Sequence, residues 1–151
     1  MDKLYESRPE AFVGDTVRAT VGCGHLYATV NVDEEGNVVE LFLNLGKSGS
    51  CAHVLTEVIG RMGSKSLKDG RQADRIMKDL IGITCDKWSG SPMHCTSCAD
   101  AAGRAIGRAL GLFNDELQLI EKGGDKDGQG KDEGEGKDNE HGSGDSSESH
   151  S

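Results

Sequence analysis

The feature that most limits how this 151-residue chain can fold is its last stretch, which has no aliphatic or aromatic side chain from Glu121 onward. Such a segment buries too little apolar surface to offset the conformational entropy that it would lose on ordering. Ten acidic residues and four lysines give it a net charge of −6, out of −9 for the whole chain. We therefore expect a flexible N-terminus over residues 1–14, one small domain over 15–115 and a disordered acidic tail over 116–151.

Charge and hydropathy exclude several classes of function for the remaining residues. Lysines and arginines form no cluster or stripe of the kind that binds nucleic acid, so we expect no nucleic-acid partner. The first residues lack a basic start and an apolar core, and no 18 apolar residues run together, so we expect a cytoplasmic protein with no membrane contact. In a reducing compartment, five cysteines point to metal binding, redox chemistry or buried thiols.

Apolar residues alternate with polar ones in three stretches between Val17 and Leu45, which is the pattern of half-buried β-strands. Turn-forming residues separate these stretches at 22–24 and at 33–37. Because both connections are short, we expect an antiparallel meander of three strands.

After Leu45 the apolar period changes to that of α-helices. A first helix opens after the segment 46–50 and ends near Gly70, a second covers 73–81, and a third covers 98–112, with Thr96 or Ser97 as its N-cap. The residues expected to face the core from the first helix are Cys51, Leu55, Val58, Ile59 and Met62. The order predicts an α+β fold, an N-terminal three-stranded antiparallel meander followed by three helices packed on one face.

Four of the five cysteines fall at the ends of predicted elements, where side chains from different segments can converge; these are Cys23, Cys51, Cys85 and Cys98. A tetrahedral zinc site needs four thiolate or imidazole ligands, and the CxxC spacing of Cys95 and Cys98 supplies one pair. The other ligands of zinc or another transition metal would come singly from the remaining cysteines or from the histidines beside them, which are His25, His53 and His94.

Two other interpretations of the cysteines stay open. In a thiol redox module, Cys98 would start a helix whose dipole stabilises its thiolate, and Cys95 would resolve a mixed disulfide. In a plain interaction domain, the thiols would be small buried side chains.

Several short motifs together resemble one family, the TSCPD domain. They are Gly22-Cys23-Gly24 followed by Leu26-Tyr27, the stretch from Leu45 to Cys51, the segment Gly82-Ile83-Thr84-Cys85, and Thr96-Ser97-Cys98-Ala99-Asp100, which matches the motif that names the family. The resemblance runs in order from about Val17 to Leu110. Ala99 replaces the family's proline, which loosens the entry to the third helix. Cys95 is an addition to the family pattern, so Cys23, Cys51, Cys85 and Cys98 form the expected metal set, with Cys95 as a possible substitute.

The resemblance implies a link to DNA biosynthesis, because the TSCPD domain occurs at the C-terminus of adenosylcobalamin-dependent ribonucleotide reductases and as a stand-alone small protein. A folded region of this length cannot hold the radical-bearing barrel or a cobalamin site. We therefore expect no catalytic residue and no cobalamin site in this chain. The resemblance predicts an accessory module that binds a metal and associates with a ribonucleotide reductase or with its own copies.

Overall fold

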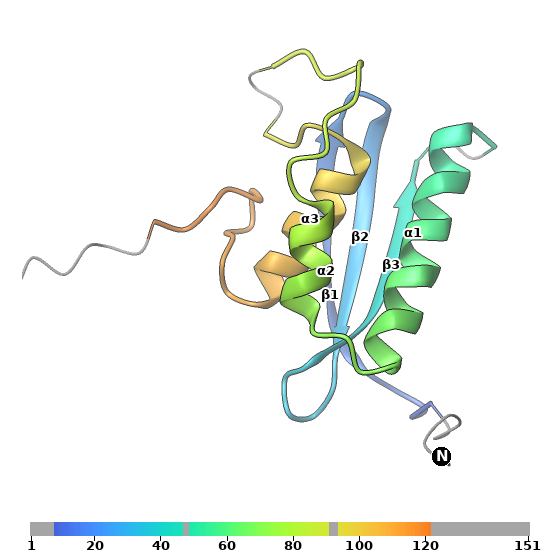
Figure 1. The fold of residues 1–151 in the computed structure, drawn as a ribbon, viewed down its shortest axis with the longest axis vertical. Helices are drawn as coiled ribbons and strands as arrows, with labels where there is room; N and C mark the ends of the chain where they lie inside the picture. The colour runs from blue at the N-terminus through green and yellow to red at the C-terminus, as the bar shows by residue number, and fades with distance from the viewer. Residues whose placement is uncertain (1–7, 47–48, 91–93, 122–151) are drawn as a thin grey trace, which may run out of the picture. The chain divides into compact units, whose positions relative to one another are not determined.

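The computed structural model of the protein describes residues 8–46, 49–90 and 94–121, and Figure 1 shows how their strands and helices follow one another. The elements are β1 (Val13–Val21), β2 (Gly24–Val32), β3 (Val38–Leu45), α1 (Cys51–Lys68), α2 (Ala73–Leu80) and α3 (Cys98–Ala109). The predicted α+β fold, with a meander of three strands followed by three helices, is confirmed.

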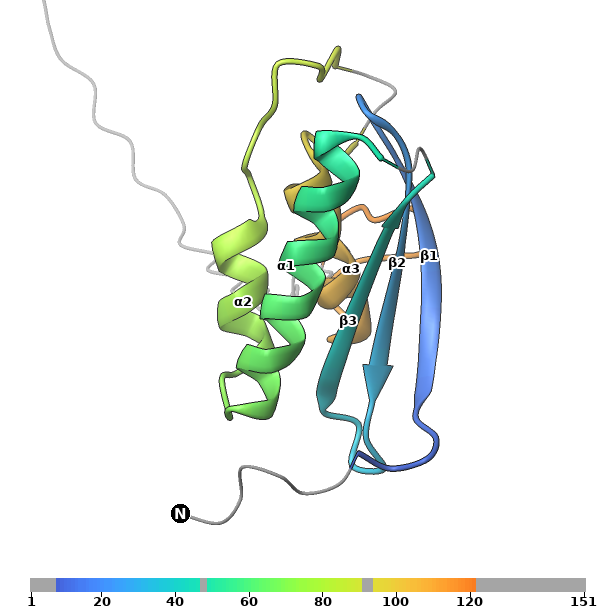
Figure 2. The same ribbon diagram turned by 90° about the vertical axis from the view of Figure 1, so that its right-hand side faces the viewer.

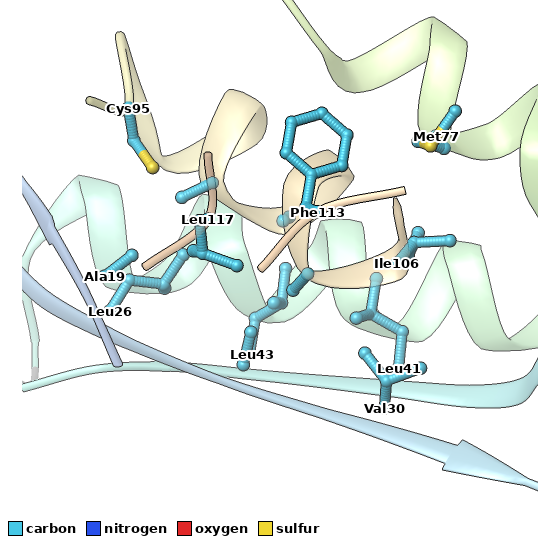
Figure 3. Close-up of a cluster of buried hydrophobic side chains, with 14 of the residues drawn as sticks. Ala19, Leu26, Val30, Leu41, Leu43, Met77, Cys95, Ile106, Phe113 and Leu117 are labelled. Atoms are coloured by element: carbon cyan, nitrogen blue, oxygen red, sulfur yellow. The ribbon is translucent and has the colours of Figure 1, made fainter. Parts of the chain in front are cut away.

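The three strands form one antiparallel sheet in the order β1-β2-β3. The pairing is regular except near Asn31 and Val32, where the register between β2 and β3 shifts. One face of the sheet carries the apolar core together with residues from the helices, and Figure 3 shows ten of these side chains by name. The buried residues that the strands contribute to this core are Ala19, Val21, Leu26, Ala28, Val30, Val38, Leu41, Leu43 and Leu45.

The helices lie on one side of the sheet, and the opposite face of the sheet carries no helix among the described residues (Figure 2). α1 packs against β3, whereas α3 packs mainly against β2 and β1. α2 packs on α3 through Ile76 and Met77, which are both buried. None of the described helices combines the length and the apolar composition needed to cross a bilayer.

α1 closes the free edge of β3 with polar side chains. The Ser64 hydroxyl accepts a hydrogen bond from the Leu41 N–H at 2.9 Å and donates one to the Leu41 carbonyl at 2.9 Å. His53 Nδ1 lies 3.1 Å from the Leu45 carbonyl oxygen. Gly60 allows the close approach, because a Cβ at that position would lie 3.2 Å from the Leu41 carbonyl oxygen. An edge strand with its outward backbone groups satisfied in this way cannot add another strand at these positions.

The orientation predicted for α1 is wrong for four of its five residues, whereas Ile59 packs against the core. Leu55 and Met62 are 61% and 66% exposed, Val58 and Cys51 are also exposed, and Ile59 is half-buried. The residues of α1 that are buried are Thr56, Gly60 and Gly63. The helix turns its small and polar side to the sheet because it meets the backbone of an edge strand, where bulky apolar side chains would hold it away. A stripe of apolar side chains therefore faces solvent on α1.

The folded unit extends past the predicted domain boundary at residue 115. Leu117 is buried in the core, Phe113 pairs with Leu119 in an isolated β-bridge, and the compact unit includes Glu121. Residues 116–121 therefore belong to the compact unit, and the disordered acidic tail stays a prediction. Residues 1–7 of the predicted N-terminus and 122–151 of the predicted tail lie outside the described residues.

Replacing Ser64 by alanine is expected to destabilise the fold by about 1–2 kcal/mol, because the Leu41 N–H and carbonyl both lose their partner at the sheet edge. Ser66→Ala is the matched control on the same helix, and its effect should stay within about 0.5 kcal/mol. Urea unfolding followed by circular dichroism measures both variants. Equal effects of the two substitutions would contradict the edge-closing role of Ser64.

Candidate functional site

The candidate site is organised by a carboxylate with no exposure to solvent, that of Asp100 in the first turn of α3. Its Oδ1 accepts a hydrogen bond from the Gly82 N–H at 2.8 Å, and its Oδ2 accepts one from the Thr96 N–H at 3.0 Å. The Arg104 Nε donates to Oδ2 at 2.8 Å and completes an ion pair one helical turn further on. A buried charge is tolerable when it is paired and hydrogen-bonded in this way.

Thr96 and Ser97 fix the start of α3 and the loop before it. The Ser97 hydroxyl caps the helix by accepting from the Asp100 N–H at 3.0 Å, so the second of the two predicted caps is the one used. The Thr96 hydroxyl donates to the Ile83 carbonyl at 2.9 Å, and the Thr96 carbonyl accepts from the Cys85 N–H at 3.1 Å. These contacts hold the segment that carries Cys85 beside the start of α3, where Cys98 lies.

The same loop packs on the turn between β1 and β2, which carries Cys23. A Cβ on Gly22 would lie only 2.3 Å from the Lys87 carbonyl oxygen, so the two backbones are in direct contact. A side chain at position 22 would therefore push the loop away. Glycine at this position allows the turn, the loop and the helix start to meet.

The surroundings of Cys98 at this junction include two other predicted ligands. Cys23 and Cys85 both act electrostatically on the Cys98 thiol. Burial is the main cause that raises the pKa of the Cys98 thiol to about 11, and the neighbouring thiols raise it further. A thiolate is unfavourable here because it would lack solvent and lie beside two groups that also acquire negative charge.

The other predicted residues lie elsewhere. Cys51 begins α1 with an exposed side chain. Cys95 is 3% exposed and belongs to the apolar core (Figure 3). The three candidate histidines have other neighbours: His25 contacts Thr20, His53 contacts the Leu45 carbonyl, and His94 contacts Gln118.

Within residues 8–46, 49–90 and 94–121, no group of three or more histidine, cysteine or acidic side chains is arranged to hold a metal ion. Cys23 and Cys85 both act on the Cys98 thiol, but the three side chains do not form a ready ligand set.

The thiol pKa values of Cys95 and Cys98 are raised, whereas a redox pair is expected to have a lowered one. Burial raises the pKa of the Cys95 thiol to about 11, and the pKa of Cys98 is raised to about the same value. The helix start was expected to lower the pKa of Cys98, but burial and the neighbouring thiols outweigh that effect. Both thiols are therefore protonated, and weakly nucleophilic, near neutral pH.

Sequence reasoning missed the importance of Asp100 and Arg104. An acidic residue in the first turn of a helix is common, because it interacts favourably with the helix dipole, so Asp100 alone gives no sign of burial. The signal was its i, i+4 spacing from Arg104 on the face of α3 that also carries buried alanines. Arg104 also donates to the Leu117 carbonyl at 3.0 Å and lies over the Phe113 ring, so it ties the C-terminal segment to α3.

Comparison with known families matches residues 3–110 to the TSCPD domain. The match covers more than half of the chain and includes the segments that carry Cys23, Cys85 and Cys98. The chain therefore belongs to the TSCPD family, whose domain is found in the context of ribonucleotide reductases. No curated protein and no solved structure is significantly similar to it.

Replacing Asp100 by asparagine is expected to destabilise the protein by about 3 kcal/mol. The amide has a single acceptor oxygen, whereas the N–H groups of Gly82, Thr96 and Arg104 all require one. Asp115→Asn is the control, because Asp115 pairs with Arg108 at the exposed surface. Denaturant unfolding of both variants tests this role, and a loss below about 1 kcal/mol for Asp100→Asn would refute it.

Alkylation of the native protein by iodoacetamide near neutral pH is expected to modify Cys51 first and Cys95 last. Cys51 is exposed, whereas Cys95 is buried and its pKa lies near 11. Mass spectrometry of peptides at successive times measures the order, and the same reaction in denaturant should remove the difference. Equal rates at the two cysteines in the native protein would be inconsistent with the described packing of Cys95.

Proposed function

We propose that this chain is an accessory module of the adenosylcobalamin-dependent ribonucleotide reductase system that has no catalytic activity of its own. In this proposal Cys23, Cys85 and Cys98 bind a thiophilic metal ion, with zinc as the first candidate. The observation that supports it is the electrostatic effect of Cys23 and Cys85 on Cys98, at a junction where a turn, a loop and a helix start are in contact.

The chemistry of these three side chains fits a soft divalent cation. Thiols that serve only as small apolar residues would pack separately, whereas these act on one another. Neighbouring thiolates repel each other, and a bound cation removes that repulsion while lowering the pKa of each ligand. Zinc would supply positive charge and tetrahedral geometry, and the chain's own thiols would tie the three segments together.

The fourth ligand is open to test. The sequence predicts Cys51, which is exposed at the start of α1. A site with only three protein ligands would leave one position of the metal for water or for a ligand from a partner. Metal retention by a Cys51 variant separates these two forms of the site.

Family membership and surface composition support the accessory role. The compact unit that ends at Glu121 consists of three strands and three helices, and it contains no reductase barrel among its described residues. An accessory module must contact its reductase, and exposed apolar patches are typical of surfaces that contact another protein. The apolar stripe of α1 has this composition; its exposed members are Cys51, Val54, Leu55, Val58 and Met62.

The redox module based on Cys95 and Cys98 has less support. Both thiols have a raised pKa, and the thiols that act on Cys98 are Cys23 and Cys85 rather than Cys95. The interaction domain with buried thiols agrees with the burial of Cys95, but it gives no reason for the contact among the other three thiols.

Elemental analysis of the full chain, purified without chelator or metal-binding tag, tests the proposal. We expect about one zinc or similar ion per chain, and removal of the metal should lower the unfolding temperature. Cys23→Ser and Cys85→Ser should each lose the metal, because each removes a ligand.

Cys95→Ala is the matched control and should keep the metal, since Cys95 lies in the apolar core. Loss of metal in Cys51→Ser would make the site a four-cysteine one, and retention would make it a three-thiol one. The metal proposal fails if the wild-type chain binds no zinc, or if Cys23→Ser binds as much as the wild type.

A further inference from the structure

A second site lies away from the thiol cluster, in a groove between α1 and the outer face of β3. Its volume is about 1040 Å³, and no cysteine lines it. Ligand sites commonly have volumes of roughly 300–1,000 Å³, so the groove is large enough for a small organic molecule. Ligand binding in this groove does not require a metal ion at the cysteines.

One wall of the groove carries two exposed aromatic rings. Phe42 on β3 is 51% exposed and Tyr27 on β2 is 41% exposed. Phe42 pairs with Thr29 and Tyr27 pairs with Asn44, so the two rings are diagonal neighbours on the same face of the sheet. Apolar rings left exposed beside polar Thr29 and Asn44 offer a surface on which a flat aromatic ligand can stack.

The other wall carries cations from α1. Arg61, Lys65 and Lys68 follow one another at helical spacing and all line the groove. Arg61 pairs with Glu57 at the surface, and an exposed pair of this kind is weak enough to exchange partners. No carboxylate among the described residues pairs with Lys65. Four cations and two carboxylates give the lining a net charge of +2, on a chain whose net charge is −9.

Glu40 at the base of the groove does not cancel these cations. Its carboxylate is buried and accepts from Arg8 at 2.8 Å, from Asn31 at 3.1 Å and from Lys68 at 3.2 Å. These partners, with the Arg8 hydrogen bond as the largest cause, lower the pKa of Glu40 to about 2. Glu40 is thus ionised near neutral pH, and its carboxylate is engaged by Arg8, Asn31 and Lys68. Arg61 and Lys65 do not pair with it and remain available to an anion.

We propose that this groove binds a nucleotide, with the base on Phe42 and Tyr27 and the phosphates on Arg61 and Lys65. A nucleotide combines a flat aromatic group with a cluster of negative charge, and the two walls offer a partner for each part. A simple anion would leave the aromatic rings unused, and a neutral aromatic ligand would leave the cations unused.

The structure argues against two larger ligands. An extended peptide cannot pair with β3 at Leu41 and Leu45, because Ser64 and His53 already hydrogen-bond with the backbone there. A nucleic-acid strand needs a longer basic track. The cations of this lining are confined to Arg8 and one side of α1.

Titration of the ¹⁵N-labelled full chain with ATP, adenosine and tripolyphosphate, each without divalent metal, tests the proposal by NMR. ATP should shift amide signals of α1 and β3 and bind more tightly than either half-ligand. Phe42→Ala should weaken the binding of ATP by about tenfold, since stacking on an aromatic ring contributes this much. It should leave the affinity for tripolyphosphate unchanged. The double variant Arg61→Ala with Lys65→Ala should bind both ATP and tripolyphosphate about tenfold more weakly.

Lys78→Ala on α2 is the control, because Lys78 is an exposed cation that pairs with Asp74 outside the groove. It should bind ATP as the wild type does. The proposal is overturned if millimolar ATP shifts no signals of α1 or β3, or if Phe42→Ala binds ATP as tightly as the wild type. It is also overturned if tripolyphosphate alone binds as tightly as ATP, which would make the groove a simple anion site.

Discussion

The buried ion pair between Asp100 and Arg104 is the interaction on which most of the helical layer depends. Asp100 accepts hydrogen bonds from the backbone N–H groups of Gly82 and Thr96, while Arg104 donates one to the Leu117 carbonyl. One pair thus links the end of α2, the start of α3 and the last described segment of the chain. Charges without solvent are costly, so this pair is stabilising only because every one of these donors is in place.

The motif that names the family therefore has a structural role, which is to fix the start of α3 and the loop before it. Thr96 and Ser97 bind backbone groups, and Asp100 gathers the loop, so that Cys98 lies beside Cys85 and Cys23. A family motif can in this way combine scaffold residues and site residues within five consecutive positions.

Periodicity predicted the order and type of all six elements, because each has a clear apolar pattern and a turn or cap at its ends. The shared metal site that the cysteines at element ends suggested stays a prediction, since Cys23 and Cys85 act on the Cys98 thiol but form no ready ligand set with it among the described residues. The side of α1 that faces the sheet could not be predicted in the same way. The rule that apolar residues face inward assumes a partner surface made of side chains, whereas α1 meets the backbone of β3 through Ser64 and Gly60. Asp100 was missed because an acidic residue in the first helical turn is common, and one of its three donors, the Gly82 N–H, comes from a loop 18 positions earlier.

The attachment of α1 has a consequence for how the protein opens. Its buried residues are small or polar, so this helix contributes less apolar burial than its length would suggest. Segments held mainly by hydrogen bonds at a surface exchange their amide hydrogens by local opening well below the free energy of global unfolding. Departure of α1 would uncover the Leu41 and Leu45 backbone together with the aliphatic residues of β3. The form of this protein that is most prone to self-association is therefore a partly open one that keeps its three strands paired and its α3 junction intact.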